Sequence, residues 1–593
     1  MLRISRRFAW ALVVGLGCLA GGVRAAPPAG VDWPLHGLDA ANTRFSPLNE
    51  VGTGNVSKLV RAWSLHTGYK GSFQATPVVR DGVMYVSTPF NHVLAVDAAT
   101  GEEKWRYQHV LNRKETCCGP ANRGVAVGDG MVYIATIDAR LIALDRATGR
   151  LAWDRPLAEQ PAGATEDVGK MAGLPEFAQA KQVGQTGVSA NMAPQLAGDL
   201  VLVGVTGVGY GLHVETQEKG ASRLTVAGLG GNEMGLRGYL VAFDQRTGAE
   251  RWRWHVTETG WEGDFVAATG YGEALHRDLD AERAALAKHA DSWRAGGGSV
   301  WTTPAIDEKR GLLYLGTGNP APQMDDPTRP GDNRNTVSLV ALELATGKLR
   351  WAYQQVPHDR WGYDVASPPA LLTLNVDGKP RDVVAQAGKV GWLFVHDRET
   401  GALIQRSESF VPRENFFARP TEAGVRIAPG ALGGCSWSPI AVDAGAGRAF
   451  VAAIHWPAMY YTRKVENSQG LPWNSYTMVQ PVDAAESRGT LSAIELASGK
   501  LAWQVTTDKP LVGGVLATAG GLLFTGESDG RLTALSSTDG KRLWSDKVDS
   551  AVNAPPITYA VGGRQFVAVA AGGNPLFGFK TGDELIAYAL PRP

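Results

Sequence analysis

The amino-acid sequence predicts an all-β protein that is built from a repeated four-stranded unit. The first observation is a segment that recurs with few changes. Its copies are AVDAATGEEKW (95–105), ALDRATGRLAW (143–153), AFDQRTGAERW (242–252), ALELATGKLRW (341–351), AIELASGKLAW (493–503) and ALSSTDGKRLW (534–544). The second observation is that a run such as GVMYVST or GMVYIAT, typical of a strand, usually precedes a copy. Each copy reads as a strand, a tight turn at the glycine and a second strand that carries a tryptophan.

Repeats of this kind predict a β-propeller of four-stranded antiparallel blades. Several copies are about 98 residues apart, which corresponds to two blades. Seven or eight blades therefore fit, and about 70 residues per blade favour eight blades with long loops. Residues 395–405 form a degenerate copy with Gln405 at the tryptophan position, and RAWSLHTG around Trp63 supplies an early outer strand. We expect the repeat tryptophans to pack between neighbouring blades.

Two stretches interrupt the repeat. Residues 208–229 follow a strand but carry no blade signal, and DAERAALAKHADSW (280–293) has helical spacing. Long insertions on one face of a propeller are where a binding site is usually built. We expect residues 208–229 and 273–298 to shape the entrance to such a site.

The first 25 residues have the layout of a secretory signal peptide, with basic residues, a short apolar stretch and small residues before Ala25. Cleavage there leaves residues 26–593 as one propeller domain in the periplasm. A twin-arginine pair leaves export of the folded protein as a second route. Cys18 is a weak match to a lipidation site.

The charge of the exported chain argues against nucleic-acid binding. The leader contains four arginines and no acidic residue, so its removal changes the formal charge from 0 to −4. No later window approaches about 18 consecutive apolar residues. We therefore expect a soluble exported protein.

The cysteines define a candidate feature of the site. Cys117 and Cys118 are adjacent, Cys435 stands alone beside Trp437, and the sequence contains no CxxCH for an attached c-type haem. Adjacent cysteines in an exported chain can close a strained eight-membered disulfide ring, which persists only where its surroundings enforce it. Cys435 is most simply a small packed residue.

A series of motifs resembles the quinoprotein alcohol dehydrogenases, eight-bladed propellers that carry pyrroloquinoline quinone (PQQ) and a metal ion on the propeller axis. The matching segments, in order, are DWPLHGLDAANTRFSPL, ETCCGPANRGVAVGDGMVYIATIDARLIALDRATG, GGNEMGLRGYLVAFD, GGGSVWTTPAID, LLYLGTGNPAP and GGVLATAGGLLFTGESDGRLTAL. The resemblance covers essentially the whole exported chain.

The resemblance implies two walls around the flat quinone. The Cys117–Cys118 ring lies on one face and Trp301 on the other, since a planar conjugated group gains from stacking. Arg123 pairs with a cofactor carboxylate, and Lys389 lies beside the quinone oxygens and stabilises the reduced, more negative form.

The resemblance also implies further polar contacts to the cofactor. Ser299 matches a hydroxyl that bonds the cofactor, and Trp437 in GGCSWSP falls near another contact. Gln74 stands where the family usually has Glu, and Asn191 stands where it usually has Thr. Both substitutes retain hydrogen-bonding capacity, although Gln74 removes one negative charge beside an anionic cofactor.

For the metal, the resemblance implies Glu233 and Asn319 as oxygen ligands, which suit a hard cation such as Ca²⁺. The catalytic base departs from the family. The family places an Asp directly after the Trp of an HDxWD segment, whereas PHDRWGYD has Gly362 there. Asp364 stands where lanthanide-using members carry an additional metal-binding Asp. Asp364 is thus a candidate metal ligand, a candidate base, or both, and Asp359 is a less suitable replacement for the base.

These observations favour a periplasmic PQQ- and metal-dependent dehydrogenase, with Ca²⁺ or a lanthanide, that oxidises an alcohol, polyol or sugar hydroxyl. Because no haem motif is present, electrons must pass to a separate cytochrome c or a membrane quinone. The alternative is a non-catalytic or functionally altered propeller. Such a protein keeps the fold, with or without the cofactor, but its turnover is lost or altered because the usual catalytic Asp is missing. A third hypothesis, a scaffold propeller for outer-membrane assembly, gives no reason for Cys117, Cys118, Trp301 or Lys389.

Overall fold

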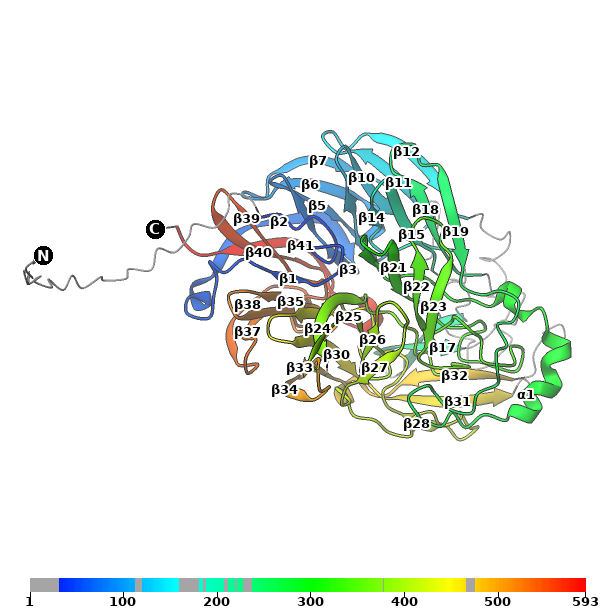
Figure 1. Ribbon diagram of the computed structural model, residues 1–593. Coiled ribbons are helices and arrows are strands. Elements are labelled where there is room, and N and C mark those ends of the chain that lie inside the picture. Colours follow the sequence, from blue (N-terminus) through cyan, green and yellow to red (C-terminus); the bar gives the residue numbers. More distant parts are fainter. Residues whose placement is uncertain are drawn as a thin grey trace, which may run out of the picture.

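The computed structural model describes residues 31–111, 120–158, 181–184, 188–206, 212–218, 221–227, 237–376, 378–464 and 475–592 (Figure 1). Almost all regular structure in these ranges is strand, and α1 (Leu279–Ala285) is the one α-helix among them. The predicted all-β class is confirmed. The residues of the proposed signal peptide lie outside the described ranges.

Eight sheets of the described chain contain four antiparallel strands that lie side by side in the sheet. The first four, by chain position, are β4 (Val78–Arg80), β5 (Val83–Ser87), β6 (Val93–Asp97), β7 (Glu103–Tyr107); β9 (Ala126–Val127), β10 (Met131–Ala135), β11 (Arg140–Asp145), β12 (Leu151–Pro156); β14 (Gln195–Ala197), β15 (Leu200–Gly204), β18 (Tyr239–Asp244), β19 (Glu250–His255); and β20 (Ala305–Asp307), β21 (Leu312–Gly316), β22 (Ser338–Glu343), β23 (Leu349–Gln354). The next three are β24 (Ala370–Val376), β25 (Lys379–Ala387), β26 (Leu393–Asp397), β27 (Leu403–Arg406); β29 (Ala441–Asp443), β30 (Arg448–His455), β33 (Arg488–Glu495), β34 (Leu501–Thr507); and β35 (Val515–Thr518), β36 (Leu522–Gly526), β37 (Arg531–Ser536), β38 (Arg542–Lys547), which β1 (Phe45–Ser46) extends in parallel.

The eighth sheet joins the two ends of the described chain. Strand β2 (Val60–Gly71) pairs with β41 (Gly582–Ala589), which continues through β40 (Arg564–Ala571) to β39 (Ile557–Val561). In Figure 1 the blue β2 accordingly lies beside the red β40 and β41. The N-terminal strand therefore completes a sheet whose other strands come from the C-terminus.

Every repeat tryptophan of the described chain except Trp544 packs on the glycine turn of the next sheet, which agrees with the predicted packing between neighbouring units. The indole Nε1 of Trp63 donates to Ala98 O at 3.1 Å, and a Cβ added to Gly101 would lie 2.6 Å from the ring. The same arrangement recurs for Trp105 over Gly149, Trp153 over Gly248, Trp252 over Gly347, Trp351 over Gly401 and Trp503 over Gly540. Only glycine fits these turns, because φ is positive and the indole fills the space of a side chain.

The series has one substitution and continues to the first sheet. Gln405 occupies the tryptophan position and lies over Gly499. The Nε1 of Trp544, on β38, donates to Leu59 O at 3.2 Å, immediately before β2. Docking contacts thus run from each four-stranded sheet to the next.

The segment 31–46 crosses the edge strands of several sheets. Its backbone hydrogen-bonds with strands β39, β4, β20, β24, β29 and β35. The guanidinium of Arg44 is fully buried and donates to His36 O, Val515 O and Pro556 O at 2.8, 2.9 and 2.6 Å. This segment therefore forms hydrogen bonds with sheets that are far apart in the sequence.

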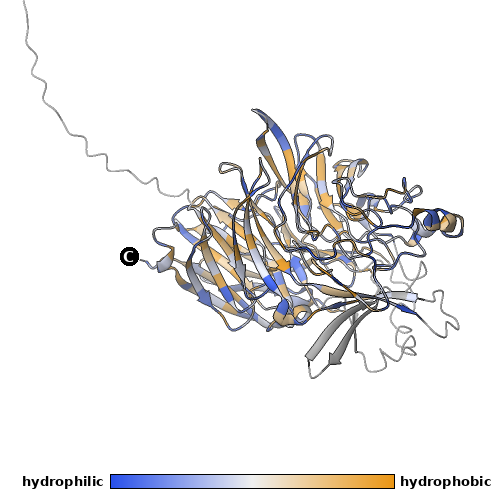
Figure 2. Ribbon diagram, turned by 90° about the horizontal axis from the view of Figure 1, so that it is seen from below, coloured by the Kyte–Doolittle hydropathy of each residue, from blue (hydrophilic) through white to orange (hydrophobic). Residues whose placement is uncertain are grey.

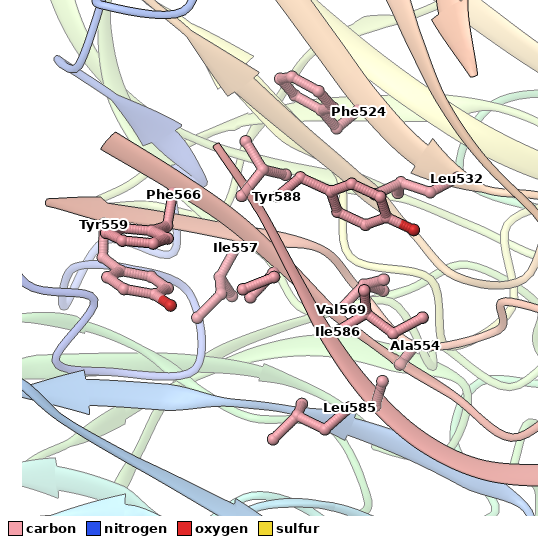
Figure 3. Packing of buried hydrophobic residues seen from close by; sticks show 14 of the residues in the cluster. Phe524, Leu532, Ala554, Ile557, Tyr559, Phe566, Val569, Leu585, Ile586 and Tyr588 are labelled. Atoms are coloured by element: carbon pink, nitrogen blue, oxygen red, sulfur yellow. The ribbon is translucent and has the colours of Figure 1, made fainter. Parts of the chain in front are cut away.

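Hydrophobic side chains fill the spaces between the sheets. Figure 2 shows apolar residues along the strands and hydrophilic ones mainly at the turns. In the cluster of Figure 3, the rings of Tyr559 and Phe566 stack at 5.3 Å with an 8° angle. The hydroxyl of Tyr559 donates to Ala98 O at 2.7 Å, so this core also links β39 to the turn after β6.

The insertions build structure of their own. A six-stranded sheet contains β13 (Lys181–Gly184), β16 (Leu212–Glu218), β17 (Ala221–Ala227), β32 (Ser475–Pro481), β31 (Ala458–Lys464) and β28 (Val425–Ile427). The helical spacing of 280–293 is confirmed by α1 and by 3-10 turns at Leu286–His289 and Ser292–Ala295. Further short 3-10 turns lie at Val56–Lys58, Pro89–Asn91, Ala484–Glu486 and Pro575–Phe577. No helix in the described ranges is long and apolar enough to span a membrane.

Candidate functional site

Loops and short inner strands from separate sheets carry the predicted cofactor residues. Strand β3 (Phe73–Thr76) carries Gln74 and pairs in parallel with β8 (Asn122–Gly124), which carries Arg123. The backbone N–H of Arg123 donates to Asn191 O at 3.0 Å. Gln74, Arg123 and Asn191 therefore lie on adjacent segments, although more than one hundred residues separate the first from the last.

A buried trio of Trp301, Asp364 and Lys389 forms the centre of the site. The Nε1 of Trp301 donates to Asp364 Oδ2 at 2.8 Å. The Nζ of Lys389 pairs with Asp364 Oδ1 and also donates to Gly362 O at 3.2 Å. The carboxylate thus accepts a hydrogen bond from an indole on one oxygen and forms an ion pair with an ammonium group through the other, which compensates a buried charge.

Arg123 completes an aromatic and cationic cluster. Its guanidinium carbon lies 4.6 Å from the ring centroid of Trp301 and 5.6 Å from that of Trp437. The two indoles are 6.3 Å apart and tilted by 52°. Cation–π attraction therefore holds Arg123 between two flat apolar surfaces. The structure brings the candidate residues Arg123, Trp301, Asp364, Lys389 and Trp437 together.

The remaining described candidates lie beside this cluster. Ser299 is buried two residues before Trp301, and its carbonyl accepts from Gly318 N at 2.7 Å. Asn319, the next residue after that glycine, is buried and accepts from Gly298 N through its own carbonyl at 2.8 Å. These backbone bonds fix Asn319 next to the segment that carries Trp301. The predicted cofactor residues Cys117 and Cys118 and the predicted metal ligand Glu233 lie outside the described residues.

Asp359 is a structural carboxylate that the sequence reasoning ranked only as a weak candidate base. It is fully buried and accepts from Asn319 Nδ2 at 2.7 Å. It also accepts from the backbone N–H groups of Trp361, Gly362 and Tyr363 at 3.2, 3.1 and 3.2 Å. Burial raises the pKa of Asp359 despite these donors. The residue holds the loop that leads to Asp364, and its oxygens are already occupied.

Gly362 lies at the position of the expected base, and Met324 fills the space that a side chain there would need. Gly362 has φ +88°, and a Cβ built on it would lie 2.5 Å from Met324 Cε and 3.0 Å from Ala431 Cβ. Met324 is itself buried with a positive φ of 66°. The absence of a carboxylate at Gly362 is therefore accompanied by a thioether that closes the vacated volume.

An ionic network next to Met324 was missed by the sequence reasoning. The ring of His358 contacts Gly331 O at 2.6 Å and Asp326 Oδ2 at 3.0 Å, and Arg360 donates to Asp326 Oδ1 at 2.9 Å. Burial opposes ionisation of Asp326, but Arg360 and His358 hold its pKa well below the usual range. By contrast, burial and then the charge of Asp326 raise the pKa of Asp325 to about 7. The only sequence signal was the adjacent DD after GTGNPAPQM.

The described residues fit a planar anionic cofactor. The cluster offers two cationic side chains and two indoles, and several buried polar atoms around it have no hydrogen-bond partner among the described residues. These atoms are Gln74 Oε1, Asn191 Oδ1 and Trp437 Nε1. Unpaired buried polar groups are rare in folded proteins and indicate that a polar ligand completes them.

The fold and this cluster define an all-β protein with a buried site suited to a planar anionic ligand, and comparison with known proteins identifies the family. The model for "PQQ: Glucose/ethanol/alcohol dehydrogenase, beta-propeller domain" matches residues 33–208, 225–416 and 407–567. The chain belongs to this PQQ-dependent family, whose members in the comparison are named as alcohol dehydrogenases, oxidoreductases that act on CH–OH donors.

Three relatives illustrate the similarity. The chain is 31% identical over 589 residues to the quinohemoprotein alcohol dehydrogenase of Comamonas testosteroni, covering 94% of this chain and 75% of that protein. It is 30% identical over 601 residues to the 1-butanol dehydrogenase (cytochrome c) of Thauera butanivorans, covering 95% and 78%. The structure of a europium-containing methanol dehydrogenase matches with a TM-score of 0.74 and 27% identity, covering 94% of this chain and 98% of the other.

Proposed function

We propose that the chain is a periplasmic dehydrogenase that oxidises the CH–OH group of an alcohol, polyol or sugar with PQQ and a bound Ca²⁺ or lanthanide ion. The observation that carries the proposal is the buried contact of Asp364 with both Trp301 and Lys389, beside Arg123. This arrangement supplies an aromatic wall, a proton acceptor and two cations within one cluster. Family membership supports the cofactor.

We further propose that the eight four-stranded sheets close into an eight-bladed propeller. The β2–β41 pairing and the unbroken series of docking contacts from one sheet to the next support closure. An axis in such a ring explains why segments that carry Gln74, Arg123 and Asn191 adjoin one another.

PQQ, when bound, supplies the electrophilic quinone carbonyl that receives the electron pair of the substrate. The chain's own residues would hold and orient it. Trp301 would provide one stacking face, and the proposed Cys117–Cys118 disulfide would provide the other. Arg123 would neutralise a carboxylate, and Gln74, Asn191, Ser299 and Trp437 would bond or contact the cofactor. Lys389 would stabilise negative charge on its oxygens.

Asp364 is the proposed base as well as a proposed metal ligand, with Asn319 and Glu233 as the other protein ligands. Each of its oxygens faces one donor, and an ionised carboxylate has about four lone-pair sites, so lone pairs remain for a substrate proton. Lys389 also donates to Gly362 O at 3.2 Å, which holds its ammonium group beside Asp364.

The electron acceptor is proposed to be a separate cytochrome c or a membrane quinone. The sequence contains no CxxCH, and one relative is named as a 1-butanol dehydrogenase (cytochrome c). Oxidation of a CH–OH group to a carbonyl releases two electrons and two protons, and this separate carrier would be the final acceptor of the electrons.

The test is reconstitution of the purified protein with PQQ and either Ca²⁺ or La³⁺, followed by reduction of an artificial electron acceptor with a panel of alcohols and polyols. We expect acceptor reduction that requires cofactor, metal and alcohol. Asp364→Asn should abolish it while cofactor binding, measured by absorption, persists. A protein that binds PQQ but reduces no acceptor with either metal would overturn the proposed activity.

The second candidate function is a quinone-binding propeller without ordinary turnover, and Gly362 is the observation that favours it. In this case the unmodified protein would bind PQQ without oxidising any alcohol. Absorption spectra and metal analysis of the purified protein separate this candidate from a protein that binds no cofactor.

A further inference from the structure

Gln323 presents a buried acceptor whose identity is fixed by its neighbours. The carboxylate of Asp359 accepts from Asn319, so the amide nitrogen of Asn319 must face it at 2.7 Å. The oxygen Oδ1 of Asn319 then faces Gln323, whose Nε2 donates to it at 2.9 Å. The carboxylate of Asp359 thus fixes the orientation of the Asn319 amide, and the Asn319 amide fixes that of Gln323. The remaining atom of the two amides, Gln323 Oε1, is a carbonyl oxygen and can only accept.

This oxygen lacks a donor within the described ranges. Gln323 is 6% exposed, and no described group lies within hydrogen-bonding distance and geometry of its Oε1. A buried acceptor without a donor is costly, and a site that retains one is usually completed by a ligand or water. The orientation through Asp359 prevents the simple remedy of an amide flip, because a flip would place two acceptors against each other.

The acceptor belongs to the loop between β21 and β22, which also carries the proposed metal ligand Asn319. It is four residues after Asn319, and the next residue, Met324, lies against Gly362. Gly362 in turn accepts from Lys389, the partner of Asp364. Gln323 Oε1 is therefore connected to the proposed base through packed and hydrogen-bonded neighbours, with an apolar thioether beside it.

We propose that Gln323 Oε1 accepts a hydrogen bond from a second hydroxyl of the substrate, so that the protein prefers vicinal diols and larger polyols to monohydric alcohols. The inference rests on the proposed function, in which Asp364 receives the reacting hydroxyl. Since Asp364 serves one hydroxyl, a further buried acceptor is suited to a second O–H donor. A site that is built to bond a hydroxyl discriminates strongly against analogues that lack it, because its acceptor is then left unpaired.

The experiment compares propane-1,2-diol with propan-1-ol in the full-length protein loaded with PQQ and metal. The ratio of their kcat/KM values is measured for the parent and for Gln323→Met, which keeps the side-chain length and removes both polar atoms. We expect the parent to favour the diol and the substitution to lower the ratio about tenfold, about 1.4 kcal/mol. A purely structural role for Gln323 would reduce both values together and leave the ratio unchanged, which would overturn the inference.

Binding provides a readout that does not depend on turnover. Saturation-transfer NMR of each alcohol with the same protein should show tighter binding of the diol to the parent and loss of that preference in Gln323→Met. Gln355→Met is the matched control, because Gln355 is also buried and its Oε1 also lacks a partner among the described residues, but it donates to Gln386 and lies against Gly388 rather than on the loop that carries Asn319. Its ratio should equal that of the parent.

The parent alone also tests the inference. Equal binding of the two alcohols to the parent would refute it even if Gln323→Met failed to fold. Preferential binding of the diol without oxidation of either alcohol would refute the proposed activity and leave the role of Gln323 supported.

Discussion

Restoring an aspartate at Gly362 should succeed only when Met324 is shortened at the same time. Gly362 has φ +88°, and a Cβ there would lie 2.5 Å from Met324 Cε, well inside van der Waals contact. The terminal methyl of Met324 must therefore move before any side chain can be accommodated. Because Met324 and Ala431 are buried around the glycine, the movement has little free space.

The size of the effect follows from these two causes. A non-glycine residue in the left-handed region costs about 1–2 kcal/mol, and overpacking a core costs about 1–3 kcal/mol. Gly362→Asp should thus lower the free energy of unfolding by about 2–5 kcal/mol. Met324→Ala alone should cost about 2–5 kcal/mol through the cavity it leaves. In the double variant the new carboxylate occupies that cavity, so the overpacking cost of about 1–3 kcal/mol is relieved.

The assay is urea denaturation of the parent, the two single variants and the double variant, with dehydrogenase activity measured on the same preparations. We expect the double variant to be more stable than the sum of the single effects by about 1–3 kcal/mol. We also expect higher activity in the double variant than in Gly362→Asp. Additivity within about 0.5 kcal/mol would refute the reasoning that Met324 fills the place of the missing base.

Three further predictions concern the charges and the docking residues. Lys389→Met should lower the free energy of unfolding by about 3–5 kcal/mol, because it leaves a buried carboxylate without its cation; loss below about 1 kcal/mol in urea titrations would contradict a buried pair. Burial and a neighbouring carboxylate raise the pKa of Asp325 to about 7. The folded state therefore binds more protons than the unfolded state between about pH 4 and 7. As pH rises through that window, the contribution of Asp325 to the free energy of unfolding falls. Asp325→Asn should therefore be more stable than the parent at pH 8, by at most about 4 kcal/mol, and similar to it near pH 4, whereas an equal difference at both pH values would be inconsistent with titration of this group. Trp351→Ala should cost about 3 kcal/mol, the lower end of the range for tryptophan, because its indole packs on the next sheet but is only half-buried. Gln405→Ala at the equivalent position should cost less, and equal midpoints for the two variants would argue against docking by the indoles.

Local sequence was sufficient to predict the all-β class and the repeated strand, turn and tryptophan unit. The strand, glycine turn and tryptophan of each repeat lie within about eleven residues of one another, so their geometry depends mainly on local backbone preferences. The degenerate copy at Gln405 was also found in the expected place over Gly499. The six-stranded sheet was not predicted, because its strands come from insertions far apart in sequence.

Sequence by itself determined that this protein is an all-β repeat with a set of motifs shared with quinoprotein dehydrogenases. It also located the missing aspartate at Gly362 and the acid two residues later. Only the tertiary structure decided that Asp364 contacts both Trp301 and Lys389 and that Met324 fills the space at Gly362. It also decided that the Oε1 of Gln323 has no donor among the described residues. These outcomes depend on interatomic distances between loops of different sheets, and such distances arise from packing rather than from the order of residues along one strand.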